Sequence, residues 1–197
     1  MTETIESPAK PHNCATDGPP HSWTVVDPGK KPEDQKKEKK EKAAELTAKD
    51  EKRAAKAKAM KSAPAKPKNA DAARSAAFEA KAIEENEKKK PIASCAVKYK
   101  CTNCGVDQEV DIVFEDGQHA ECQSHSSENY RKAMLADGEK RNQAERYVDI
   151  QRQNNQTIGV GRIGVQPMTK FDGAHMGDTT KAEALAKGAG MEPEVVK

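Results

Sequence analysis

The feature that most constrains this chain is a set of four potential metal ligands at regular spacing. Cys101 and Cys104 form a Cys-x2-Cys pair, and Cys122 and His125 form a Cys-x2-His pair further along the chain. Two such pairs are the ligand pattern of a structural zinc site, in which each pair lies on a short turn. The spacing therefore predicts one structural Zn²⁺ bound by Cys101, Cys104, Cys122 and His125.

The segment between the two pairs has the pattern of a β-hairpin. Apolar and polar residues alternate from Val110 to Phe114, and Asp116-Gly117 is a strong hairpin-turn signal. A short hairpin is marginally stable alone, whereas zinc binding contributes on the order of 10 kcal/mol in small domains of this kind. We therefore expect residues 91–126 to form a small metal-stabilised β domain.

The first pair of ligands also carries a family resemblance. The run from Tyr99 to Gly105, YKCTNCG, resembles the first knuckle of the FmdB-type ribbons of bacteria and bacteriophages, which belong to the zinc-ribbon superfamily. The likeness covers about residues 96–126. It departs at the second knuckle, where the sequence is Cys-Gln-Ser-His in place of the family's Cys-Pro-x-Cys-Gly. The resemblance implies a zinc-ribbon fold, and Cys3His is an accepted structural ligand set.

The rest of the chain offers little material for a core. Of the 197 residues 35% are hydrophobic, 4% are aromatic and 34% are charged. A globular chain is usually nearer half apolar, and so few large apolar residues poorly offset the entropy lost on folding. The fold class we expect is a small metal-stabilised β zinc ribbon followed by an α-helix and flanked by long charged helical or disordered arms.

Differences in composition divide the rest of the chain into segments before and after this ribbon. Residues 1–32 are Pro-rich and are expected to be a disordered tail, and residues 33–90 to be a Lys/Glu/Ala-rich helical or disordered arm. Within that arm, a helix is expected from about Asn69 to Lys90. After the ribbon, residues 127–154 should form a helix, which Gly138 could split. Residues 155–197 are expected to be an extended tail.

Three further motifs are assigned no site. His12, Cys14 and His21 lie in the Pro-rich tail without a flanking hairpin, and scattered polar residues are the favoured interpretation. Cys95 could replace His125 as a ligand, but it lies outside the knuckle and is interpreted as a free or partly buried thiol. Residues 159–164 match G-x-G-x-x-G but neither follow a strand pattern nor open a helix, so nucleotide binding is not expected.

Charge leaves two classes of partner open. Residues 30–90 contain twenty Lys or Arg and twelve Asp or Glu, so this arm could bind nucleic-acid phosphates, although the interleaved acids weaken that interpretation. The ribbon itself is acidic, which favours a protein partner over groove reading. We expect no signal peptide, and the sequence contains no apolar run long enough to span a membrane. We expect an intracellular protein, or a virion component if the chain is viral.

These observations predict a non-enzymatic protein with one structural zinc ion and no small-molecule substrate. Four protein ligands leave no open position on the metal for catalysis. The first hypothesis is an adaptor or structural component of a macromolecular assembly, such as a bacteriophage-like particle. The alternative is a nucleic-acid-associated regulatory protein tethered through residues 30–90.

Overall fold

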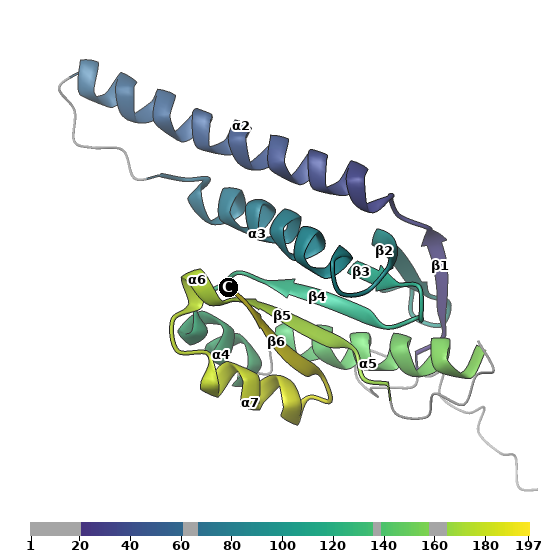
Figure 1. The fold of residues 1–197 in the computed structure, drawn as a ribbon. Helices are drawn as coiled ribbons and strands as arrows, with labels where there is room; N and C mark the ends of the chain where they lie inside the picture. The colour runs from purple at the N-terminus through teal and green to yellow at the C-terminus, as the bar shows by residue number, and fades with distance from the viewer. Residues whose placement is uncertain (1–20, 61–66, 136–138, 158–164) are drawn as a thin grey trace, which may run out of the picture.

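A mixed six-stranded sheet forms the middle layer of the structure (Figure 1). The computed structural model describes residues 21–60, 67–135, 139–157 and 165–197. The spatial order of the strands follows the chain: β1 (Trp23–Asp27), β2 (Ile92–Cys101), β3 (Asp107–Phe114), β4 (His119–Gln123), β5 (Met168–Asp172) and β6 (Glu192–Val196). Neighbours from β1 to β4 are antiparallel, whereas β4, β5 and β6 are parallel.

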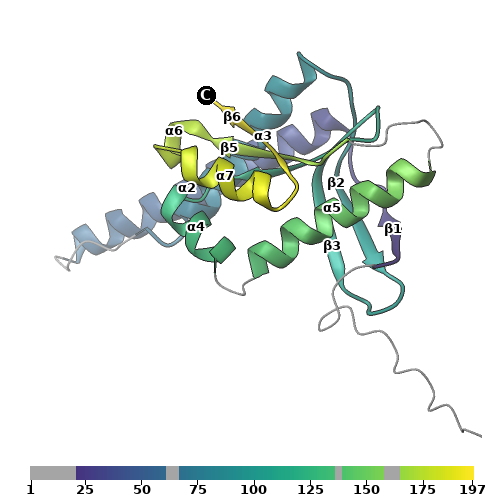
Figure 2. The same cartoon turned by 90° about the horizontal axis from the view of Figure 1, so that it is seen from below.

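Helices cover both faces of this sheet (Figures 1 and 2). One face is covered by α2 (Pro32–Ala59) and α3 (Ala70–Glu87). The other face carries α4 (Ser127–Leu135), α5 (Glu139–Thr157), a short α6 (Gly173–Met176) and α7 (Thr180–Gly188). Parallel neighbours require a crossover connection, and helices α4 and α5 make it between β4 and β5, as α6 and α7 do between β5 and β6. The described residues therefore form a layered α/β domain.

The core has two parts, one on each face of the sheet. The larger part lies under α4, α5 and α7 and includes Tyr147, Ile150 and Phe171. The smaller part joins α3 to the sheet through Phe78 and Ile83, which pack with Ile112 and Phe114. Burial of these apolar side chains on both faces is the main favourable contribution to folding.

The expected fold class, a small zinc ribbon with charged arms, is wrong. The segments predicted as arms and tail supply α2, α3, β1, β5 and β6 to one α/β domain. Two physical reasons explain the error. Half of the residues that α3 buries are alanines, which add little to a count of large apolar residues but allow close packing. Strand β5 buries polar residues in place of an apolar run, namely Thr169, Lys170 and Asp172.

Several local expectations agree with the structure. The predicted hairpin is present as β3 and β4, and its turn places Gly117 at a φ of 82°, which favours glycine. The helix expected from about Asn69 corresponds to α3. The helix expected after the ribbon is present as α4 and α5, and Gly138 between them lies outside the described residues. In the described parts of the chain, no helix is long and apolar enough to cross a membrane.

The stability of the chain should depend on α3. Replacing Ile83, which is fully buried, with Ala should lower the free energy of unfolding by about 2–4 kcal/mol through lost burial and a residual cavity. The matched control is Met60→Ala, because Met60 is 66% exposed at the end of α2. Urea denaturation of both variants measures the difference. Equal midpoints for the two variants would instead match a solvated arm.

Candidate functional site

A cluster of three potential metal ligands lies at the end of β2. The ligand atoms of His21, Cys101 and Cys104 all come within 4.8 Å of one another, and Cys104 Sγ is 3.6 Å from His21 Nδ1. Two thiols and an imidazole are a ligand set that binds transition metals. These three residues could therefore hold a metal ion.

The two cysteines are positioned by the turn that joins β2 to β3. Cys101 ends β2, and its N–H donates to the carbonyl of Val106 at 2.9 Å. The N–H of Gly105 donates back to the Cys101 carbonyl at 2.8 Å, and Gly105 has a φ of 74°. This left-handed conformation suits glycine and lets the turn close tightly after Cys104.

His21 is brought to the cysteines by contacts with both β2 and α5. The N–H of Thr102 donates to the carbonyl of Ser22 at 2.7 Å. From the other side, the buried carboxylate of Asp149 accepts the N–H of His21 at 2.8 Å and the indole N–H of Trp23 at 3.3 Å. Helix α5 therefore fixes the residues that flank the imidazole.

The electrostatics at the turn favour a thiolate at Cys101. Burial disfavours ionisation of this thiol, but hydrogen bonds from the backbone of Cys104, Ser22 and Asn103 and from His21 lower its pKa to about 6. A thiol with this pKa is largely ionised at neutral pH, and the thiolate is the metal-binding form.

Only two of the four predicted ligands belong to this cluster. Cys101 and Cys104 do, whereas Cys122 lies within β4, half-buried against the α3 side of the core, and His125 is exposed after β4. The complete set of four stays a prediction. Cys95 is fully buried in β2, and burial raises the pKa of its thiol to about 12, as expected for a thiol without a metal.

His21 is the potential ligand that sequence reasoning missed. It was grouped with His12 and Cys14, which lie outside the described residues, and interpreted as part of a tail. The available signal was the short apolar run after it, because Trp23–Asp27 pairs with β2 and places Trp23 opposite Cys101. A strand there carries His21 to the knuckle.

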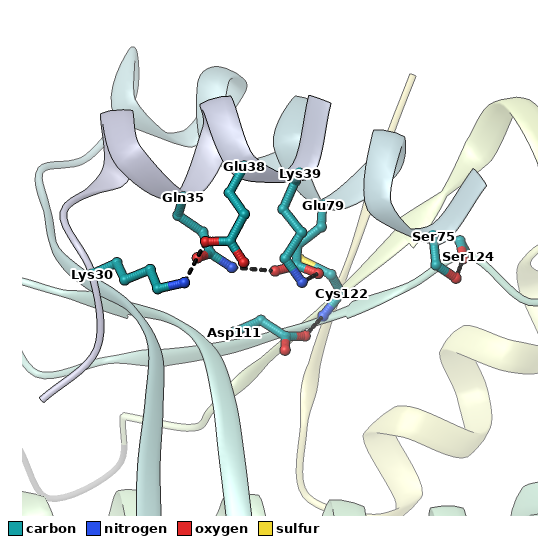
Figure 3. A network of polar contacts seen from close by, with 9 residues as sticks. All are labelled: Lys30, Gln35, Glu38, Lys39, Ser75, Glu79, Asp111, Cys122 and Ser124. Atoms are coloured by element: carbon teal, nitrogen blue, oxygen red, sulfur yellow. Dashed lines mark hydrogen bonds and ion pairs between the residues drawn. The ribbon is translucent and has the colours of Figure 1, made fainter. Parts of the chain in front are cut away.

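A second group of polar side chains lies where β3 and β4 separate. These strands are paired only at Ile112↔Ala120 and Val113↔His119, after which β4 continues beside β5. The N–H of Cys122, left without a partner on β3, donates to the Asp111 carboxylate at 2.7 Å (Figure 3). Asp111 therefore lies at the fork between the two strands.

Two more carboxylates lie in the electrostatic field of Asp111. Glu121 comes from β4, is 3% exposed and accepts a hydrogen bond from the Gln123 amide. Glu79 comes from α3 and is also buried. Its Oε1 accepts from Gln35 Nε2 at 3.0 Å, and its Oε2 lies 2.6 Å from Lys39 Nζ (Figure 3). We refer to Glu79, Asp111 and Glu121 as the acidic site.

The other two carboxylates of the acidic site raise the proton affinity of Asp111. Burial raises the pKa of Asp111 well above its usual range, and the charges of Glu79 and Glu121 raise it further. Burial and the charge of Glu121 also raise the pKa of Tyr130. Such mutual repulsion is typical of functional sites and would be relieved by a bound cation.

Three buried polar atoms around the acidic site have no hydrogen-bond partner. They are Oε1 of Gln35, Oε1 of Gln123 and the hydroxyl of Tyr130, and each of these residues is about 2% exposed. Buried polar atoms are normally paired, so unpaired ones indicate positions for a ligand or water. Each belongs to a residue that contacts, or lies in the field of, Glu79 or Glu121.

The three carboxylates do not yet converge on one point. Among the described Asp, Glu, His and Cys side chains, the group that comes within reach of one ion is His21, Cys101 and Cys104. Glu79 is engaged by Lys39 and Gln35 of α2, so a shared ion would require Glu79 to exchange these partners.

The acidic site was also missed from the sequence. Glu79 stands in a run rich in charge, and Asp111 and Glu121 were counted as surface acids of a ribbon. The available signal was their placement on either side of the Asp116-Gly117 turn, which puts both on neighbouring strands. The G-x-G-x-x-G match at 159–164 lies outside the described residues.

Comparisons with protein-family models, with curated proteins and with solved structures find no match to this chain.

The metal content of single variants should show which ligand set binds the ion, the cluster at the end of β2 or the predicted set of four. Cys101→Ser, Cys104→Ser and His21→Ala should each lower the content of tightly bound metal, because each removes a ligand. Cys122→Ser should retain it. Elemental analysis after dialysis measures the stoichiometry. Loss of metal in Cys122→Ser with retention in His21→Ala would restore the predicted set.

Removing the charge of Asp111 should stabilise the protein more as the pH rises. Because folding raises this pKa, the stability contributed by the protonated form is complete below the unfolded pKa, about 3.9, and is lost as the pH rises through the native pKa. Asp111→Asn keeps an oxygen for the Cys122 N–H. Its melting temperature minus that of wild type should therefore increase from pH 4 to pH 8, with Glu115→Gln as an exposed control. A pH-independent difference would contradict this account.

Proposed function

We propose that this protein is a divalent-cation-dependent hydrolase of phosphodiester bonds in nucleic acid, with its active site at the acidic site. The observation that carries the proposal is that Asp111, at the fork between β3 and β4, lies in the electrostatic field of two further carboxylates, Glu79 of α3 and Glu121 of β4. Buried like charges are costly unless a function or a counter-ion requires them.

The donor types support a hard cation. Carboxylate and amide oxygens are the ligands that Mg²⁺ and Mn²⁺ prefer, and the unpaired Oε1 of Gln123 adds such an oxygen beside Glu121. A divalent cation bound there would polarise a phosphoryl oxygen and lower the pKa of its bound water. Asp111 and Glu121 would hold it, and the Tyr130 hydroxyl is available to orient a polar group of the substrate.

The charge distribution supports an anionic substrate. Residues 30–90 contain eight more Lys and Arg than Asp and Glu, and they include the two helices that cover the acidic site. A basic segment raises the local concentration of a polyanion and steers its approach. A carboxylate site beside a basic segment is therefore matched to a nucleic-acid backbone.

We infer a separate, structural role for the cluster at the end of β2, with zinc as its metal. Thiolates and imidazole favour Zn²⁺ over the hard cations of the acidic site. The ion would tie His21, at the start of the sheet, to the turn between β2 and β3. It would stabilise the edge strand β1, in which Val25 and Val26 are more than half exposed.

A second candidate function is a non-enzymatic adaptor in an assembly. One feature favours it: α2 is 28 residues long, and its end projects past the start of α3 (Figure 1). An exposed helix of this kind can dock onto another protein. This candidate predicts stoichiometric, salt-resistant binding of a protein partner and no hydrolysis.

Cleavage assays test the principal proposal. Full-length protein should hydrolyse single-stranded or duplex oligonucleotides with Mg²⁺ or Mn²⁺, and EDTA should stop the reaction. Asp111→Asn and Glu121→Gln should each lower the rate by about 100-fold or more, because each removes a cation ligand. Glu115→Gln changes an exposed carboxylate just after β3 and is the matched control.

Two outcomes would contradict the proposal. One is cleavage unchanged by Asp111→Asn and Glu121→Gln. The other is no cleavage and no binding of Mn²⁺ by the wild-type protein, which would favour the adaptor.

A further inference from the structure

We propose that the far end of α2 is a contact surface for a nucleic-acid backbone. Three exposed lysines form this surface, and we refer to Lys52, Lys56 and Lys58 as the basic tip. The class of its partner rests on the proposed function, but binding at the basic tip requires no hydrolysis.

The basic tip lies on a part of α2 that projects from the domain. Of the 28 residues of α2 only Gln35, near its start, is buried, and the opposite end extends past the start of α3 (Figure 1). Lys68 adds an exposed cation beside this part of the helix, because Asp50 accepts its backbone N–H at 3.1 Å. The end of α2 is therefore accessible to a large partner.

No acidic residue is interleaved with the basic tip. From residue 52 to residue 70 the sequence has no Asp or Glu. Within the described part of this stretch, the ion pair is that of Arg53 with Asp50 at 3.6 Å, which leaves the three lysines of the tip directed to solvent. Their positive charge is therefore not neutralised by the domain.

The near half of α2 differs, because acids neutralise its lysines. Residues 31–49 contain seven Lys and five Asp or Glu. Three more acids reach this half from α3, where Glu79, Glu84 and Glu87 pair with its lysines. The excess positive charge of the helix is therefore concentrated at its far end.

Helix stability explains only part of the basic tip. Lys56 and Lys58 lie in the last turn of α2, where cations favour the helix through its macrodipole. That effect falls off within the last turn, so it does not explain Lys52, which lies one turn earlier. An anionic partner outside the domain accounts for all three lysines.

The chemistry of the basic tip matches a phosphate backbone. Lysine is a point charge on a flexible stem, so it pairs with phosphates without a fixed geometry. Residues 52–70 contain no aromatic side chain on which a base could stack. Contacts to phosphates alone carry no sequence information and depend steeply on salt. We therefore expect binding that is independent of sequence.

The basic tip would anchor a substrate without taking part in the reaction. Lys52 stands thirteen residues beyond Lys39, the lysine of α2 that lies in the field of Asp111. At about 1.5 Å per residue, this separation is about 20 Å along the helix. The tip can therefore contact only phosphates away from the bond that is cut, so its removal should raise KM and leave kcat unchanged.

A salt series of duplex binding tests the basic tip. The full-length protein is titrated into a fluorescein-labelled DNA duplex of random sequence, without Mg²⁺ or Mn²⁺, and followed by fluorescence anisotropy. Lys52→Gln/Lys56→Gln/Lys58→Gln should reduce the slope of log Kd against log salt by about 2–3, because each neutralised phosphate contributes about 0.9.

Two control variants separate charge from structure. Lys31→Gln/Lys37→Gln/Lys42→Gln removes the same charge from exposed positions in and just before the near half of α2, and should change the slope by less than about 1. Lys52→Arg/Lys56→Arg/Lys58→Arg keeps the charge of the tip and should bind as wild type does. Equal weakening by the Arg and Gln variants of the tip would contradict phosphate contact by charge.

The outcomes separate the basic tip from the proposed function. A slope unchanged in the Gln variant of the tip, or reduced equally in the near-half control, would overturn the tip even if the protein cleaves nucleic acid. A slope reduced in the tip variant alone, with no cleavage by wild type, would support the tip and overturn the hydrolase. No duplex binding by wild type would overturn the tip, and binding of phosphatidylserine vesicles instead would assign these lysines to a membrane surface.

Discussion

The fork between β3 and β4 is the constraint on which the arrangement around it depends. Strand β4 leaves β3 after two residue pairs because it continues beside β5, and this leaves the Cys122 N–H without a partner on β3. The Asp111 carboxylate accepts a hydrogen bond from that N–H, but in this position it has limited access to water, which disfavours its charged form. The neighbouring elements place polar side chains around the fork. Acids, amides and a lysine therefore line it, whereas a core is normally apolar.

Helix α5 links this fork to the cluster at the end of β2. Near its middle, the Tyr147 hydroxyl donates to the carbonyl of Glu109 on β3 at 2.9 Å. Within the next two turns, Asp149 and Gln153 accept hydrogen bonds from the backbone N–H groups of His21 and Trp23. The two candidate sites thus share one rigid support, and a metal at the β2–β3 turn would also fix the position of α5 against β3.

Local pattern and spacing predicted part of this from the sequence. The hairpin, the extent of α3 and the Cys101–Cys104 turn follow from alternation, propensity and turn chemistry, which act over a few residues. His21 and the parallel strands β5 and β6 depend on contacts between distant segments. Trp23–Asp27 becomes a strand because β2, more than sixty residues later, offers an edge for it. No local signal identifies which edge a short strand will join.

The same limit explains why the charge of residues 30–90 was hard to interpret. In sequence, the lysines of α2 suggest a free polycation, but in the structure those at its near end face the acidic residues of α3, through pairs such as Lys36–Glu87 and Lys40–Glu84. At the far end, where α2 projects past the start of α3, Lys52, Lys56 and Lys58 are exposed (Figure 1). The charge run therefore differs along its length: ion pairs attach its first half to α3, and its second half presents exposed lysines to solvent.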